Sequence, residues 1–289
     1  MNIDLGDFRV PAGEKVKLAH WATAAHRICR SEQQYKKLLA EDVEKLSGLQ
    51  RLLYASNSRS LLLVFQAMDA AGKDGAISHL LTGVNPQGCE VHSFKHPSAD
   101  ELEHDFLWRT ARRAPARGRI GVFNRSYYEE VLIVRVHPEI FLAEGHGPRA
   151  SKTIWKHRYQ SINDWERHLQ RSGVQILKFF LHLSKEEQRK RFLQRIDQPD
   201  KNWKFSLADI AERKFWRQYM KAYEECLGAT STRRAPWYVV PADDKFSARL
   251  IVSRVVIEAL EGFKMRYPKM TRARRSELQA IRKSLARNT

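Results

Sequence analysis

The chain has 289 residues, of which 43% are hydrophobic, and this suits a single large globular domain with a sizeable core. It has no apolar stretch of membrane-spanning length, no apolar segment of the secretory type near its start, and three scattered cysteines. These features predict a cytoplasmic protein without disulfides or a zinc site. Its formal net charge of +18 favours a polyanionic partner, such as nucleic acid, an anionic membrane or a phosphate polymer.

The first predicted element is a helix over residues 32–54, where apolar side chains recur at helical spacing. Five short apolar runs follow, each leading into a helical pattern, and two helix starts have capping-box spacing (Ser98 with Glu101, Ser184 with Glu187). Strands that alternate with helices predict an α/β fold: a mainly parallel sheet covered by helices on both faces. The predicted strands are residues 61–65, 89–94, 120–123, 174–183 and 237–240.

The segment after the first strand partly matches the phosphate-binding loop G-x-x-x-x-G-K-[ST]. Gly72 and Lys73 stand at their motif positions, whereas Ala67 replaces the first Gly and Asp74 replaces the metal-binding hydroxyl. An ordinary turn with a surface lysine is the alternative, but a small-residue loop between strand and helix favours phosphate binding. The metal ligand must then be another oxygen, and Asp69 is the natural candidate for Mg²⁺. The predicted phosphate-binding loop comprises Ala70, Ala71, Gly72, Lys73, Asp74 and Gly75.

Polar residues also follow the second and third predicted strands. Lys95 comes after the second strand, and Asn124 and Arg125 come after the third. Ligands of parallel sheets bind beyond the carboxyl ends of the strands, so we expect these residues near the loop. An Asn at a strand end is usually a turn former. Because P-loop enzymes carry a metal-associated Asp at the equivalent position, we favour a functional role for Asn124.

A cation-rich segment with interspersed acids follows the fourth strand. This composition is typical of a lid that closes over a phosphate site and supplies arginines to the transferring group. A solvated helix face is the alternative. Trp203, which stands between two lysines, favours the lid, because an exposed Trp usually packs on or stacks with something. The cations of this segment are Arg189, Lys190, Arg191, Arg195, Lys201 and Lys204.

Residues 264–289 form a basic C-terminal tail with nine Lys or Arg and one Glu. This basic composition predicts that the tail is an extension that binds a polyanion. Its apolar residues leave open a second interpretation, in which it is a helix packed against the rest of the chain. Those residues are Met265, Leu278, Ile281 and Leu285.

These motifs, taken in order, resemble the polyphosphate kinase 2 family, and most closely its branch that accepts nucleoside mono- and diphosphates. The matching runs are MDAAGKDG, GVNPQGCEVHSFKHPS, HDFLWR, GVFNRSYYEEVLIVRVHPE, DQPDKNWKFS and APWYVVPADDKFSAR, which cover most of residues 61–260. The resemblance implies a P-loop kinase-like sheet with a helical lid and dependence on Mg²⁺. It also implies reversible transfer between inorganic polyphosphate and AMP, ADP or ATP, and a homodimer or homotetramer.

Position by position, the resemblance implies that Asp69 and Lys73 are the acid and lysine of the loop. Asn124 and Arg125 match the second motif, where other branches have Asp. Glu129 follows at the spacing of the family and, with Asn124, is expected to bind the nucleotide. The expected catalytic residues are Asp69, Lys73, Asn124, Arg125, Arg191 and Arg195. Lys95, Lys201 and Lys204 are expected to bind further phosphates.

The sequence therefore predicts one domain over residues 1–289, with an N-terminal helical extension (1–58), a lid (185–226) and the basic tail (264–289). Phosphoryl transfer would need positioning and charge neutralisation and no general base, because the attacking phosphate oxygen is already anionic. Two alternative functions are an ATP-dependent nucleotide kinase and a basic nucleic-acid-binding protein. No helix-turn-helix, zinc-finger or ribonucleoprotein signature supports the second, so we expect no specific nucleic acid and no membrane as partners.

Overall fold

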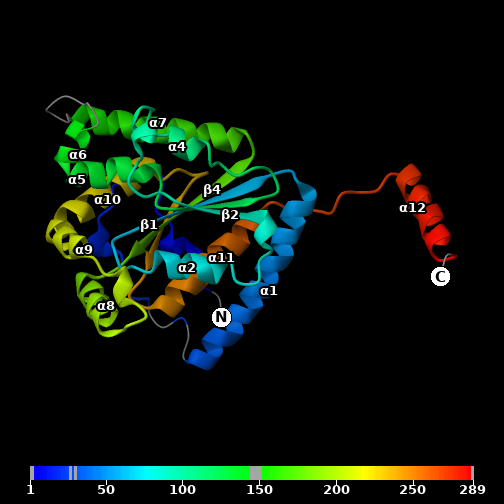
Figure 1. The fold of residues 1–289 in the computed structure, drawn as a ribbon, viewed down its shortest axis with the longest axis horizontal. Helices are drawn as coiled ribbons and strands as arrows, with labels where there is room; N and C mark the ends of the chain where they lie inside the picture. The colour runs from blue at the N-terminus through cyan, green and yellow to red at the C-terminus, as the bar shows by residue number, and fades with distance from the viewer. Residues whose placement is uncertain (1–2, 26–27, 29–30, 144–151, 288–289) are drawn as a thin grey trace.

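The computed structural model describes residues 3–25, 28, 31–143 and 152–287. At its centre is a five-stranded sheet with the order β2-β3-β1-β4-β5, in which every pairing is parallel (Figure 1). The chain builds β2 and β3 on one side of β1, and β4 and β5 on the other. This change of direction opens a crevice at the carboxyl end of β1. The strands are β1 (Ser60–Ala67), β2 (Cys89–Ser93), β3 (Ile120–Asn124), β4 (Val174–His182) and β5 (Trp237–Pro241).

The predicted strands are all present, and their ends differ by one or two residues. β1 shows the largest extension, because its pairing with β4 continues from Ser60 to Ala67, beyond the purely apolar run. Every residue of β1 is buried, as expected for a central strand with helices on both faces. The edge strand β2 is only partly buried.

Helices cover both faces of the sheet and enclose a separate hydrophobic core on each (Figure 1). The predicted α/β fold is thereby confirmed. The helices on one face are α1 (Glu32–Ser56), α2 (Lys73–Leu80) and α11 (Lys245–Gly262), and those on the other are α5 (Ile133–Val136), α7 (Lys152–Arg171) and α10 (Trp216–Thr230). The shorter or peripheral helices are α3 (Ala99–Leu102), α4 (Trp108–Ala111), α6 (Pro138–Ala143), α8 (Lys185–Asp197) and α9 (Leu207–Glu212).

Both helix starts with capping-box spacing are capped. Ser98 accepts a hydrogen bond from the amide of Glu101, whose carboxylate accepts one from the amide of Ser98. Ser184 accepts one from the amide of Glu187 at the start of α8. These bonds satisfy amides that lack partners in the first helical turn.

Residues 3–25, which we call the N-terminal strap, contain two short 3-10 turns (Leu5–Phe8 and Leu18–His20) and no α-helix. The N-terminal extension is therefore helical chiefly in α1. The strap lies along the outer edge of β5, where Val10 donates its amide to the carbonyl of Trp237 at 2.9 Å. Covering this edge occupies backbone groups that would otherwise be open to another strand.

The C-terminal helix α12 (Arg272–Leu285) stands away from the body at the end of an extended segment (Figure 1). None of its residues is buried, and Leu278, Ile281 and Leu285 are all exposed. The tail is thus helical over Arg272–Leu285, as one interpretation proposed, but this helix does not pack against the rest of the described chain. Met265, near the start of the tail, packs against the core. Among the described residues, no helix is long and apolar enough to cross a membrane.

Candidate functional site

The loop between β1 and α2 lies at the carboxyl end of the central strand. Its turn is made by Ala70 (φ 62°) and Gly72 (φ 99°), both in the left-handed region. Ala67 still belongs to β1 and has no positive φ, so the missing first Gly of the motif does not strain the backbone there. A left-handed alanine is unfavourable by about 1–2 kcal/mol, so the surrounding structure must hold Ala70 in place.

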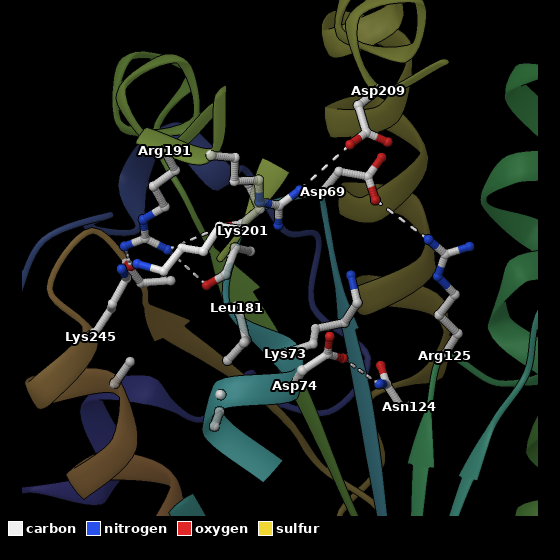
Figure 2. Close-up of a pocket in the computed structure, with 18 of the residues that line it drawn as sticks. Asp69, Lys73, Asp74, Asn124, Arg125, Leu181, Arg191, Lys201, Asp209 and Lys245 are labelled. Atoms are coloured by element: carbon white, nitrogen blue, oxygen red, sulfur yellow. Dashed lines mark hydrogen bonds and ion pairs between the residues drawn. The ribbon is translucent and has the colours of Figure 1, made fainter. Parts of the chain in front are cut away.

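Helix α8 holds this loop from outside through three successive carbonyls. Gln188 donates to the carbonyl of Asp69 at 3.0 Å. Arg191 donates to the carbonyls of Ala70 at 3.1 Å and Ala71 at 3.0 Å (Figure 2). The amide of Ala71 donates to the carbonyl of Met68 at 3.3 Å. The other amides of the loop can bind an anionic ligand.

Lys73 begins α2 and lies in the middle of the site, with its Nζ donating to the carbonyl of Ala67 at 2.8 Å. Burial lowers the pKa of Lys73, because a charged ammonium is less well solvated there. The carboxylates of Asp69, Glu129 and Asp74 oppose this shift and favour the charged form. A phosphate bound at the loop would favour it further.

Two polar pairs lie between the loop and the end of β3. Arg125 Nη2 is 3.4 Å from Asp69 Oδ1, and Asn124 Nδ2 donates to Asp74 Oδ1 at 2.7 Å (Figure 2). Arg125 has a φ of 62°, a left-handed conformation that is uncommon for a residue with a long side chain. Strained backbone of this kind is typical of functional sites.

Glu129 lies in the 3-10 turn after β3 and does not line the cavity described below. Burial raises the pKa of its carboxyl group, while the nearby cations Arg125 and Lys73 and a hydrogen bond from Gln66 favour the ionised form. Glu129 thus lies behind Lys73 and Arg125, where its charge can balance theirs. The structure gives it no direct contact surface toward a nucleotide in the cavity.

The lid approaches the site from α8 and α9. Arg195 Nη1 lies 3.5 Å from Asp209 Oδ2 at the edge of the cavity. Lys201 points into the cavity (Figure 2), and Trp203 lies at its rim with 74% of its surface exposed. Trp203 belongs to the 3-10 turn Asn202–Lys204. Lys204 ends this turn, and its side chain lies outside the described residues.

The start of α11 adds two cations, Lys245 and Arg249, to the same wall as Lys201. Burial lowers the pKa of Lys245, and the neighbouring charges of Arg191, Lys201 and Arg249 lower it further. Three of the charged neighbours of Lys245 are cations and one, Glu187, is an acid, so positive charge predominates at this wall. An anionic ligand would offset this charge.

One cavity of about 930 Å³ unites these elements. Among the predicted site residues whose side chains are described, it brings together all except Glu129, which lies behind it. Sequence reasoning predicted Arg191 and Arg195 on α8 but missed the residues that α9 and α11 contribute. A signal was present for α11, because the segment that carries Lys245 and Arg249 follows the carboxyl end of the fifth predicted strand. The missed charged or polar residues are Ser93, Gln194, Asp209, Lys245 and Arg249.

The oxygen ligands at the loop suit a hard cation such as Mg²⁺. Asp69 and Asp74 both line the cavity, and their carboxylates are partly exposed. In the described part of the chain no group of three or more His, Cys, Asp or Glu side chains could hold a metal. This arrangement fits Mg²⁺, which usually keeps several waters and binds one or two carboxylates together with substrate phosphates.

Comparison with known proteins identifies the family of the chain. Residues 29–268 match a family model described as Polyphosphate kinase 2 (PPK2). The chain is 61% identical over 287 residues, 99% of both chains, to an ADP-polyphosphate phosphotransferase of Rhodopseudomonas palustris. It is 45% identical to an AMP/ADP-polyphosphate phosphotransferase of Meiothermus ruber over 78% of this chain and 80% of that one. The crystal structure of polyphosphate kinase 2 from Arthrobacter aurescens superposes with a TM-score of 0.85 at 40% identity, over 94% of this chain and 95% of that one.

Proposed function

The chain belongs to the polyphosphate kinase 2 family, and on this basis we propose that it transfers a phosphoryl group reversibly between inorganic polyphosphate and a nucleotide. The acceptors we propose are ADP, giving ATP, and AMP, giving ADP. The name of the relative with 61% identity contains only ADP, whereas that of the relative with 45% identity contains both. The proposal that AMP is accepted is therefore tested separately below.

The cavity at the carboxyl end of β1 is the observation that carries this proposal. It joins a phosphate-binding loop to cations from three other elements: Arg125 after β3, Lys201 in the lid and Lys245 on α11. A nucleoside triphosphate as the phosphoryl donor would not require so many cations. A polymer with one negative charge on each phosphate does, because every charge removed from water needs a compensating group.

We assign the two substrates to opposite sides of the loop. Positive charge predominates at the wall of Lys201, Lys245 and Arg249, which suits the polyphosphate chain beyond the transferred group. The opposite side contains Asn124 and Lys95, next to the carboxylates of Asp69 and Asp74. This mixed-charge side suits a nucleotide whose phosphates arrive with Mg²⁺.

The residues of the loop would perform the transfer mainly by positioning and charge neutralisation. Lys73 and the loop amides would bind the transferring phosphoryl group, and Arg125 would stabilise the charge on its oxygens. Arg195, paired with Asp209 at 3.5 Å, is available at the lid edge to approach the phosphates. Arg191 already donates to carbonyls of the loop, so we propose that it shapes the loop.

Asp69, with Asp74 beside it, would hold Mg²⁺ at the side of the loop. The ion would supply charge neutralisation on phosphate oxygens when bound. The homodimer or homotetramer implied by the resemblance, and the cytoplasmic location predicted from the sequence composition, remain part of this proposal. Light scattering of the purified protein measures its oligomeric state directly.

Steady-state kinetics with polyphosphate as the sole phosphoryl donor test the proposal. The wild type should form ATP from ADP and ADP from AMP, without any added nucleoside triphosphate. Lys245→Ala/Arg249→Ala should raise the KM for polyphosphate by about 10-fold or more, the scale of lost charge-assisted hydrogen bonds, and leave the KM for ADP nearly unchanged. Arg217→Ala/Lys221→Ala removes two exposed charges of α10 outside the cavity and is the matched control.

Turnover only with ATP as donor would contradict the proposed donor. Equal effects of both double variants on the KM for polyphosphate would contradict the assignment of its chain to the wall formed by Lys201, Lys245 and Arg249.

A further inference from the structure

Asp243, in the turn after β5, connects three segments that are far apart in the sequence. Its Oδ1 accepts a hydrogen bond from the amide of Ser184 at 2.8 Å, and its Oδ2 accepts one from Thr23 Oγ1 at 2.8 Å. Its own amide donates to the carbonyl of Thr23 at 2.9 Å. Asp243 therefore ties the N-terminal strap to the residue that caps α8.

Arg191 continues this connection from α8 to the phosphate-binding loop. Its guanidinium makes five hydrogen bonds, each to a protein acceptor. The acceptors lie on three segments: the carboxylate of Glu187 on α8, the carbonyls of Ala242 and Asp243 after β5, and the carbonyls of Ala70 and Ala71 in the loop. Arg191 is only 4% exposed, so these bonds lie in a poorly solvated place where each one matters.

The loop needs such support because its backbone is strained. Ala70 has a φ of 62°, which a β-carbon disfavours. The bonds from Gln188 and Arg191 to three successive carbonyls fix this conformation. Both side chains come from the first two turns of α8, whose start is fixed by Ser184 and Asp243.

We infer that Asp243 and Thr23 are positioning residues for the phosphate-binding loop. Neither lines the cavity. They act through the start of α8, whose Gln188 and Arg191 hold the loop in its phosphate-binding shape. The N-terminal strap thus helps to position the phosphate-binding loop and also covers the edge of β5. The effect on turnover rests on the proposed function, whereas the effect on the loop backbone does not.

Two variants of the full-length protein test the inference. Asp243→Ala removes both carboxylate bonds but leaves the cap of α11, which Asp244 provides. Thr23→Val removes one hydroxyl at nearly constant volume and serves if Asp243→Ala folds poorly. Ser231→Ala is the matched control, because the Ser231 hydroxyl bonds to the strap at Val10, at 2.8 Å, and makes no bond to α8 or to the loop.

Hydrogen exchange is the readout that does not depend on activity. Asp243→Ala and Thr23→Val should speed amide exchange over residues 68–80, which include the loop and α2, whose first turn bonds to the loop through Ala76 and Gly72. Ser231→Ala should speed exchange in the strap and β5 and leave residues 68–80 unchanged. Unchanged exchange over residues 68–80 in both test variants would overturn the inference.

Turnover should follow the same pattern. Because small displacements of a positioned reactant reduce rates strongly, kcat should fall by about 10- to 100-fold in Asp243→Ala and less in Thr23→Val. The kcat of the double variant Asp243→Ala/Thr23→Val should be no lower than that of Asp243→Ala, since both residues act through one connection. Equal losses of kcat in Ser231→Ala and Thr23→Val would show that the loss comes from a general decrease in stability. This result would overturn the positioning role. A wild type without turnover would contradict the proposed function and leave the exchange test decisive for the loop.

Discussion

Lys73 and Asp69 are the residues on which the phosphate chemistry of the loop depends most directly. Lys73→Ala and Asp69→Asn should each lower kcat by about 10²- to 10³-fold, because each removes a charged group positioned at the transferring phosphate or its metal. Their circular dichroism and melting temperature should stay near those of the wild type, since Asp69 and Lys73 are only half-buried. Turnover within a few-fold of the wild type in either variant would rule out its assigned role.

Acceptor choice is the second question at the scale of single residues. Asn124 Nδ2 donates to Asp74 Oδ1 at 2.7 Å, and Asn124→Asp would replace this bond by repulsion between two carboxylates. The added charge would also repel an incoming phosphate. AMP must bring its only phosphate to the point that the second phosphate of ADP reaches, so it lies deeper and is affected more. We predict that Asn124→Asp lowers kcat/KM for AMP more than for ADP.

Glu129→Gln is the companion variant, because it removes the charge behind Lys73 and Arg125 without adding bulk. It should lower kcat for both acceptors to a similar extent, since Glu129 does not line the cavity. Polyphosphate-driven turnover is measured with each acceptor in turn. An unchanged ratio of AMP to ADP turnover in Asn124→Asp would remove the role of Asn124 in acceptor choice.

Much of the site follows from local sequence rules, and the rest depends on tertiary contacts. The loop and Asn124–Arg125 could be predicted because motif spacing and strand ends place them together. The use of the Arg191 donors on loop carbonyls could not be predicted, because it depends on the position of α8 beside the loop. The place of Glu129 behind the cavity depends likewise on the tight 3-10 turn after β3.

At the scale of elements, His137 joins the lid to the helices on the opposite side of the site. It lies between α5 and α6, and its two ring nitrogens face Glu139 and Glu212, each at 2.9 Å. Glu212 ends α9 and also accepts a hydrogen bond from Tyr219 at 2.6 Å. Partial burial disfavours the charged imidazole, but the bonds to Glu212 and Glu139 outweigh it and raise the pKa of His137.

A raised pKa in the folded state means that this contact stabilises the protein when His137 is protonated. The contribution is fully present below the pKa of an unfolded histidine, about 6.5, and is lost as the pH rises through the higher folded pKa. The free energy of unfolding of the wild type, minus that of His137→Gln, should be largest below about pH 6.5 and decrease on the alkaline side. His157→Gln, at an exposed position of α7, is the control. A difference that grows with pH would contradict this assignment.

The five strands, helix α1 and the capped starts of α3 and α8 could be predicted, because periodicity and caps are local signals. The ends of β1 could not be placed, since they depend on the register with β4. The strap could not be predicted either. Its irregular backbone is held by contacts with distant segments, such as the bond from Ser231 to Val10.

At the scale of the whole molecule, the basic tail is the feature that extends away from the body (Figure 1). Helix α12 stands apart from the body, so the apolar spacing that suggested a packed helix does not lead to packing on this chain. The sequence could predict a basic tail and a helical pattern but not their position. The order of the strands in the sheet was equally beyond local patterns, because it depends on which connections cross over β1.

We predict that the tail strengthens binding of long polyphosphate by charge. Truncation after Met270 keeps Met265, which packs against the core, and removes six Lys or Arg and one Glu. The affinity for long chains should fall and its dependence on salt should become shallower, because fewer counterions are released on binding. Short chains such as tripolyphosphate should bind as before.

Leu278→Ser/Ile281→Ser is the control for the tail, since it keeps every charge and removes part of the exposed apolar stripe. It should leave the affinity for long polyphosphate and its salt dependence unchanged. A truncated protein with the salt dependence of the wild type would show that the tail takes no part in binding polyphosphate.

Phosphorus NMR of the wild type mixed with polyphosphate, ADP and Mg²⁺ tests the central claim most directly, because it follows donor and product in one sample. The account predicts that the terminal phosphate signal of ATP grows while the internal polyphosphate signal decreases, and that excess ATP drives the reaction backwards. The same mixture with Lys73→Ala should stay unchanged over the same time. Folded wild-type protein that forms no ATP from polyphosphate, but phosphorylates a nucleotide when a nucleoside triphosphate is added, would contradict the account.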